Sequence, residues 1–139
     1  MSKVGDLAVD FYAQGYNCCE SVWLAFADDL TAEERDMGLK LAGGFGGGMG
    51  AGGDCGALCG GIMVLGRWYG RKVGEPRQAE LPQLTKALYE YMSEQYGHSD
   101  CRNLKPSGDH KPTCSGYVRA VAEMTEFLLD QGLETEDCG

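Results

Sequence analysis

The sequence predicts an all-α fold, a single-domain bundle of about five or six helices with a glycine-rich loop before a central apolar helix. Two observations favour helices: apolar residues recur three and four positions apart along several segments, and residues typical of helix caps precede many of those segments. A third observation excludes a sheet, because no run alternates between apolar and polar side chains. A chain of 139 residues can bury a core of its own, so we expect one domain over residues 1–139.

The first two helices follow from apolar spacing and from a capping box. Residues 2–14 have apolar side chains at helical offsets, and Gly15 is a suitable end for this amphipathic helix. Asn17 then offers an N-cap, and Glu20 stands three residues later, where its side chain can bond back to the cap. A second helix is therefore expected over residues 18–28.

A third helix leads into a stretch of glycines. Thr31 and Glu34 form another capping box, and the helix that they begin ends where the glycines start. Residues 43–61 read G-G-F-G-G-G-M-G-A-G-G-D-C-G-A-L-C-G-G. Glycine costs roughly 0.5–1 kcal/mol relative to alanine inside a helix, so these glycines indicate a backbone of special geometry. Phe45 and Met49 are expected to be buried within this stretch, which favours a fixed loop over a flexible linker.

The most apolar segment, residues 54–69, is expected to be the central helix. It carries almost no charge, which is typical of a helix that is buried on most sides. Asp54 is a good N-cap, and this places Cys55 in the first turn. The positive end of the helix dipole would favour the thiolate of that cysteine.

Two more helices complete the predicted bundle. A polar link over residues 70–82 precedes a helix that ends at Gly97. Residues 98–113 hold both histidines of the chain and two prolines, so this segment is expected to be irregular apart from a short turn after Asp100. The last helix is expected over residues 114–131, where apolar residues again recur at helical spacing.

The charge of the chain narrows the choice of partners. The formal net charge is −9 and the sequence pI is about 4.6, so a nucleic acid or an anionic membrane would repel the protein. The sequence shows neither an apolar signal segment nor an apolar run of the roughly 20 residues that a membrane span needs. We therefore expect a cytoplasmic protein that binds neither nucleic acid nor membrane.

The cysteines are the strongest functional signal. The chain has seven, and in a reducing compartment such a number favours redox or metal chemistry over structural disulfides. Four of them directly follow residue types that favour helix N-caps. The pairs are Asn17–Cys18, Asp54–Cys55, Asp100–Cys101 and Thr113–Cys114. If these helix starts converge, their free N–H groups and dipoles would stabilise thiolates or an anionic metal–sulfur centre.

Several motifs resemble one protein family over nearly the whole chain. They are G-Y-N-C at residues 15–18, F-G-G-G at residues 45–48, C-G-A-L-C-G at residues 55–60, and then Cys101 and Cys114. This combination resembles the C_GCAxxG_C_C family of bacterial and archaeal proteins, which are regarded as redox-active. The resemblance implies that the family's four cysteines, which would serve as redox-active thiols and metal ligands, are Cys18, Cys55, Cys101 and Cys114.

The resemblance also carries expectations about cofactor and partners. Similar domains are joined to a haem module in split-Soret-type cytochromes, which implies electron transfer and suggests an iron–sulfur centre. This chain lacks the C-x-x-C-H motif, so no covalent haem is expected. A redox partner protein is expected, of unknown identity. The haem-linked relatives and the apolar central helix are compatible with a homodimer.

Three interpretations of the four thiols remain open. An iron–sulfur cluster, with [2Fe–2S] favoured, needs thiolates, a shielded pocket and N–H donors, and it ranks first. A thiol–disulfide oxidoreductase or relay without metal needs two close thiols, one of them exposed and of low pKa, and it ranks second. A structural zinc site ranks third, because such sites usually take their ligands in closely spaced cysteine pairs.

Other residues near the four cysteines are assigned smaller roles. The residues expected to contact the cofactor in addition are Gly46, Gly47, Gly48 and Cys59. Cys59 stands four residues after Cys55 on one helical face, where it could resolve a disulfide, although packing is the commoner role of such a residue. Cys19 is turned by about 100° from Cys18 on a helix, so both cannot face one site equally. Cys138 lies next to the chain end and is expected on an exposed tail.

No other catalytic motif competes with the cysteines. The glycine stretch lacks the G-K-[ST] ending of a phosphate-binding loop and follows a predicted helix, so nucleotide binding is not expected. His98 and His110 flank Cys101 and are interpreted as solvated surface residues, whereas Arg102 could help to hold a thiolate. The spacing of residues indicates no hydrolase or transferase, and an oxidoreductase is the one enzyme class that the cysteines suggest.

Overall fold

The computed structural model describes residues 3–131, and within this range the fold is all-α. Its helices are α1 (Lys3–Ala13), α2 (Cys18–Ala25), α3 (Ala32–Ala42), α4 (Gly56–Tyr69), α5 (Glu80–Tyr96), α6 (Cys101–Leu104) and α7 (Lys111–Gln131). Two short turns, η1 (Gly43–Phe45) and η2 (Gly48–Gly52), lie in the glycine stretch. Among residues 3–131 the only β-type pairing is an isolated bridge between Asp54 and Asp100. The predicted fold class is therefore confirmed.

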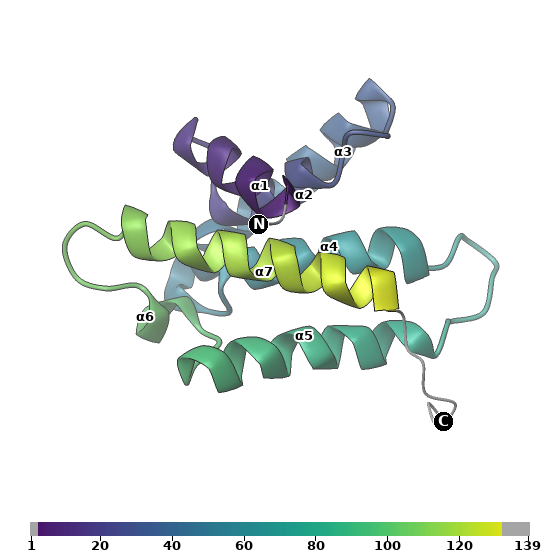
Figure 1. The fold of residues 1–139 in the computed structure, drawn as a ribbon. Coiled ribbons are helices and arrows are strands. Elements are labelled where there is room, and N and C mark those ends of the chain that lie inside the picture. The colour runs from purple at the N-terminus through teal and green to yellow at the C-terminus, as the bar shows by residue number, and fades with distance from the viewer. Residues whose placement is uncertain (1–2, 132–139) are drawn as a thin grey trace.

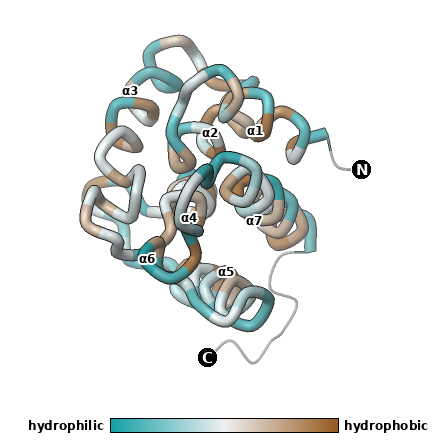
Figure 2. The backbone as a smooth tube through the Cα atoms, turned by 90° about the vertical axis from the view of Figure 1, so that its left-hand side faces the viewer, coloured by the Kyte–Doolittle hydropathy of each residue, from teal (hydrophilic) through white to brown (hydrophobic). Residues whose placement is uncertain are grey.

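Helix α4 is the centre of the bundle, as its sequence predicts. It packs against α2, α5 and α7, and Figure 2 shows it enclosed by them. Its buried residues are Gly56, Ala57, Leu58, Gly60, Gly61, Val64 and Leu65. A Cβ atom on Gly60 would lie 2.8 Å from the backbone oxygen of Cys19, and one on Gly61 would lie 2.6 Å from Cδ2 of Leu88. The glycines of α4 therefore allow neighbouring helices to approach closely.

The remaining helices pack mainly on the helices around α4 and less on α4 itself. Helix α1 packs on α7 and α2, whereas α3 contacts mainly α2. Figure 1 shows α5 and α7 side by side, connected through α6 at one end of the bundle. The starts of α6 and α7 therefore lie at the same end of the molecule as the end of α5.

The two predicted capping boxes are present. In α2 the N–H of Glu20 donates to Oδ1 of Asn17, and the N–H of Asn17 donates to Oε1 of Glu20, each over 2.8 Å. Thr31 and Glu34 form the same reciprocal pair at α3. Helix α2 is shorter than predicted, because it ends at Ala25.

The prediction that Asp54 caps the central helix is wrong. Cys55 occupies the N-cap position itself, and no side chain caps the helix there. The cause is a backbone clasp, which we define as two hydrogen bonds: the N–H of Cys55 donates to Ser99 O over 2.8 Å, and the N–H of Cys101 donates to Gly53 O over 2.6 Å. The clasp pairs Asp54 with Asp100 in a bridge, and a carboxylate oxygen of Asp54 accepts from Oγ of Ser99 over 3.4 Å.

The last helix begins three residues earlier than predicted, at Lys111 instead of Cys114. The N–H of Lys111 donates to Oδ1 of Asp109 over 3.2 Å, and Pro112 is tolerated in the first turn because the amides there have no helical partner. Thr113 consequently lies inside α7 and does not cap it. Cys114 still belongs to the first turn, and its N–H donates to His110 O over 2.9 Å. The predicted tail position of Cys138 lies outside the described residues.

The glycine stretch has a defined backbone, but one side-chain prediction for it is wrong. Met49 is 48% exposed and not buried, whereas Phe45 is half-buried. Met49 and four neighbouring glycines adopt positive φ angles, which L-residues other than glycine rarely adopt. A Cβ atom on Gly48 would lie 2.8 Å from Cβ of Cys101, so the loop passes directly beside that cysteine.

One negative result concerns membranes. Over residues 3–131, no helix combines the length and the apolar character that a membrane span requires.

Candidate functional site

Four cysteines that are distant in sequence line one small cavity. The residues around it are Cys18, Cys55, Gly56, Cys101, Leu104, Lys105, Cys114 and Tyr117. We call this space the thiol cavity. Its volume is about 20 Å³, which is room for one water molecule. The structure thus brings together the four cysteines that the sequence singled out, whereas their roles as redox-active thiols and metal ligands stay a prediction.

Each cysteine reaches the thiol cavity from a helix start. Cys18 is the first residue of α2 and Cys101 is the first residue of α6. Cys55 is the N-cap of α4, and Cys114 lies in the first turn of α7. The first amides of a helix have no helical partner, so those at the starts of α2 and α4 are free to donate to the cysteine sulfurs.

Some of these N–H groups donate to the sulfur atoms. Sγ of Cys18 accepts from the backbone N–H groups of Gly47 and Cys19. Sγ of Cys55 accepts in the same way from Ala57 and Leu58 in the first turn of α4. The glycine stretch therefore contributes directly to the site, through the backbone of Gly47.

Burial nevertheless keeps these thiols protonated. Desolvation, followed by repulsion from the Cys18 thiolate, raises the pKa of Cys55 to about 12, although its two N–H donors act in the opposite direction. Desolvation also raises the pKa values of Cys18 and Cys114. The sequence led us to expect a thiolate at Cys55, and that expectation is wrong for the free protein because burial outweighs the helix dipole.

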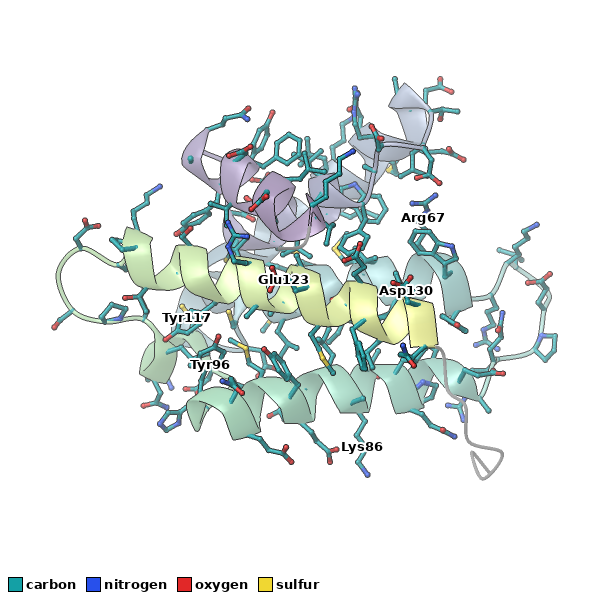
Figure 3. All side chains as sticks on the ribbon, viewed as in Figure 1. Arg67, Lys86, Tyr96, Tyr117, Glu123 and Asp130 are labelled. Carbon is teal, nitrogen blue, oxygen red and sulfur yellow. The ribbon has the colours of Figure 1, made fainter. Side chains whose placement is uncertain are left out.

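Two tyrosines that sequence reasoning missed also belong to the site. The hydroxyl of Tyr12 is hydrogen-bonded to the Cys114 thiol. The hydroxyl of Tyr117 donates to Leu104 O over 2.8 Å and so ties α6 to α7. Figure 3 shows Tyr117 and Tyr96 together at this end of the bundle, where their ring centroids lie 4.9 Å apart. Tyr117 could have been found, because it follows Cys114 by three residues and shares its helical face.

The remaining predicted glycines lie near the cavity without lining it. A Cβ atom on Gly46 would lie 2.8 Å from Nδ2 of Asn17, so Gly46 packs on the cap of α2. Gly48 packs against Cys101. Their predicted contact with a cofactor stays a prediction.

Two further cysteines lie outside the thiol cavity. Cys19 is fully buried, and its thiol donates to Sδ of Met63 over 3.6 Å. Desolvation, together with the negative charge of Asp54, raises the pKa of Cys59 to about 11. Burial, followed by negative charge on Cys59 and Cys18, also raises the pKa of Cys19.

The polar residues around Cys101 have different surroundings. Nη2 of Arg102 donates to Ala51 O over 3.0 Å, so this guanidinium holds the glycine loop. His98 is exposed, in agreement with its interpretation as a surface residue. His110 is half-buried and lines a pocket beside the cavity, and Lys105 lines the cavity itself.

The four thiols are suitable ligands for a metal–sulfur centre, but their present positions are not those of a metal site. Four thiols are a donor set typical of zinc or iron–sulfur clusters. In the part of the chain that the structure describes, however, no three His, Cys, Asp or Glu side chains are close enough to share a metal ion. A volume of about 20 Å³ also cannot hold a cluster of several atoms. Binding of such a group therefore requires the thiol side chains to turn.

Comparison with known proteins supplies one match. The sequence profile of a family described as "Putative redox-active protein (C_GCAxxG_C_C)" matches residues 16–128. No curated protein and no solved structure matches the chain. The matched range contains the four cysteines of the thiol cavity and the whole glycine stretch.

Proposed function

This chain belongs to the C_GCAxxG_C_C family of redox-active proteins, and from that premise we propose that it transfers or senses electrons through one centre built on the thiol cavity. The observation that carries the proposal is the meeting of Cys18, Cys55, Cys101 and Cys114 around one cavity. These residues come from four separate elements and lie up to 96 positions apart (114 − 18), so chance proximity is a poor explanation.

We further propose that the centre is an iron–sulfur cluster held by the four cysteines. Such a cluster supplies one-electron chemistry when bound, and N–H groups directed at sulfur tune its potential. Gly47, Ala57 and Leu58 already direct N–H groups at the cysteine sulfurs. Burial raises the pKa values of Cys18, Cys55 and Cys114, and negative charge on neighbouring sulfurs raises them further. A bound cation would offset both effects and favour the thiolates.

A relay of thiols and disulfides is the second candidate, and one observation favours it. The sulfurs lie near enough to influence each other electrostatically, although no three of them share a metal-binding point among residues 3–131. In this scheme two thiols form one S–S bond, while two protons leave to solvent and two electrons pass to the disulfide of a partner protein. The raised pKa values of Cys18, Cys55 and Cys114 would slow such exchange, so we rank this function second.

Anaerobic purification tests the first proposal. We expect protein that contains iron and sulfide and that absorbs visible light. Cys55→Ser and Cys114→Ser should each lose most of the iron, because each removes one of four ligands. Cys59→Ser is the matched control, since Cys59 lies outside the thiol cavity, and it should keep the colour.

Two outcomes would decide between the candidates. Colourless protein without iron or sulfide, in which Cys18, Cys55, Cys101 and Cys114 cycle reversibly between thiol and disulfide, would replace the cluster by the relay. Loss of iron that is equal in Cys59→Ser and Cys55→Ser would contradict the assignment of the thiol cavity as the cluster site.

A further inference from the structure

Two larger pockets open beside the thiol cavity, and both are lined by basic side chains. The first has a volume of about 240 Å³, and its walls include Cys18, Cys101, Cys114, Lys105, His110 and Lys111. The second has a volume of about 350 Å³ and includes Cys101, Arg102 and Lys105. Neither pocket has an aspartate or glutamate in its wall.

The composition of the chain makes this absence of carboxylates unexpected. The sequence contains 21 acidic and 12 basic residues. Two other hollows of similar size contain carboxylates beside an arginine: Asp28 and Asp36 line one of about 340 Å³ with Arg35, and Glu34 lines one of about 400 Å³ with Arg67. The positive pockets are therefore local exceptions on an acidic protein, and they coincide with the thiols.

The basic side chains of these pockets are not paired with carboxylates in ion pairs. Among residues 3–131, Lys105, Lys111 and Arg102 form no ion pair with a carboxylate. Asp109 is the acidic residue nearest in sequence to Lys111, and its carboxylate accepts the backbone N–H of Lys111. Asp100 stands beside Cys101, and its carboxylate accepts from the side chain of Asn103 over 2.7 Å.

Lys105 and Lys111 come from different segments, and both line the first pocket. Lys105 ends α6 and lines both pockets as well as the thiol cavity. The ammonium group of Lys111 lies 5.0 Å from the centroid of the Tyr12 ring, which keeps it at the wall of the first pocket. Two lysine ammonium groups without carboxylate partners are suited to bind an anion.

We propose that the pocket between Lys105 and Lys111 binds a small anion beside Cys101. Lysine ammonium groups pair with carboxylate-type and phosphate-type oxygens, and the net negative charge of the chain disfavours binding of such a ligand elsewhere on the surface. The bound anion would be a reactant only if the redox centre proposed above is correct, and in that respect the inference rests on the proposed function. Binding itself depends on the charges of the pocket.

Charge-selective alkylation tests the proposal on the full-length, reduced and metal-free chain. Iodoacetate and iodoacetamide attack thiols by the same chemistry and differ by one negative charge. The rate ratio of iodoacetate to iodoacetamide at Cys101, measured by mass spectrometry, should exceed that of N-acetylcysteine by about tenfold at low salt. The excess should shrink as salt is added.

Substitution of the lysines identifies the source of the effect. In the double variant Lys105→Gln with Lys111→Gln, the ratio should fall to near the N-acetylcysteine value. The matched control is Lys40→Gln with Lys86→Gln, which changes the net charge equally on α3 and on the outer side of α5, where Figure 3 shows Lys86 pointing away from the bundle. This control should keep the wild-type ratio. Cys59, beside Asp54, should show the opposite preference within the same molecule.

A second measurement does not depend on thiol reactivity. Titration of isotope-labelled protein with inorganic phosphate should shift the backbone resonances of Gly47, Lys105 and Lys111, and the lysine double variant should not respond. An alkylation ratio at Cys101 equal to that of N-acetylcysteine, or phosphate shifts that the double variant retains, would overturn the proposal. Iron content is measured separately on anaerobically purified protein. A raised alkylation ratio in a protein that binds no iron would contradict only the cluster, and bound iron without a raised ratio would contradict only the anion site.

Discussion

Gly61 and Gly66 occupy one helix but face different surroundings. A Cβ atom on Gly61 would lie 2.6 Å from Cδ2 of Leu88 and 2.7 Å from Oγ1 of Thr125. A Cβ atom on Gly66 would meet no atom within 4 Å. The same substitution should therefore have opposite effects at two positions five residues apart (66 − 61).

We expect Gly61→Ala to lower the free energy of unfolding by about 1–3 kcal/mol, because the new methyl group overpacks the contact between α4 and its neighbours. Gly66→Ala should raise it by about 0.4–1 kcal/mol, because alanine reduces the freedom of the unfolded chain without a clash. Urea denaturation of both variants beside the wild type measures the two changes. A stabilising Gly61→Ala would contradict the close packing of α4.

At the scale of single residues, the sequence predicted the cysteines better than their surroundings. Cys18 could be placed at a helix start because its capping box joins residues three apart in the chain. Cys101 also begins a helix, as predicted, but the side chain of Asp100 does not cap that helix. Tyr12 and Lys105 could not be assigned to the site, because they come from segments whose distance from Cys114 is set only by the fold. The pKa of Cys55 was predicted in the wrong direction for the same reason: local sequence shows the dipole, whereas burial is a property of the whole core.

Helices α2 and α3 both begin with a capping box. Both have a complete capping box, but only the box of α2 stands beside a cysteine of the thiol cavity. Asn17 also donates from Nδ2 to Gly43 O over 3.2 Å, which links the start of α2 to the glycine stretch. Substitution of each cap therefore distinguishes loss of helix stability, expected in both cases, from misplacement of a cavity cysteine, expected only at α2.

We expect Asn17→Ala and Thr31→Ala each to lower the free energy of unfolding by about 1 kcal/mol, since each removes a side-chain acceptor from a helix start. Only Asn17→Ala should also reduce the iron content, because Cys18 follows the lost cap directly. Denaturation curves and metal analysis of the two variants check both statements. Equal iron loss in Thr31→Ala would show that the effect is one of general stability and not of cysteine placement.

At the scale of elements, periodicity predicted which helices exist, but local sequence did not always predict where they begin. The starts of α2 and α3 were predicted because their boxes involve residues three apart. The start of α4 was displaced by the hydrogen bond from Cys55 to Ser99, a partner far away in the sequence. The start of α7 was displaced because Asp109 accepts from Lys111 and Pro112 continues the helix.

At the scale of the molecule, the thiol cavity joins elements that are otherwise held mainly by apolar packing. Helices α2, α4, α6 and α7 each supply one cysteine, Cys55 at the N-cap of α4 and the others within their helices. A group bound to all four sulfurs would connect these elements and would bind the native state in preference to the unfolded chain. The homodimer and the redox partner protein stay predictions at this scale.

Loading of the centre should therefore stabilise the whole protein. With iron–sulfur donor at 100 times the dissociation constant, the free energy of unfolding should rise by about 2.7 kcal/mol. Anaerobic denaturation before and after chelation measures this difference. Cys59→Ser should retain the stabilisation and Cys55→Ser should lose it, whereas equal stability of loaded and chelated wild type would exclude a cluster that bridges the four elements.

The backbone clasp between residues 53–55 and 99–101 has a consequence for how the protein is made. It joins segments about 45 residues apart and encloses α4 and α5, both of which leave the ribosome before α7 is synthesised. The nascent chain can thus bring Cys55 and Cys101 together while Cys114 has not yet been translated. Cys114 is translated last of the four, so the cluster proposed above could bind all four cysteines only after the carboxyl-terminal helix has been synthesised.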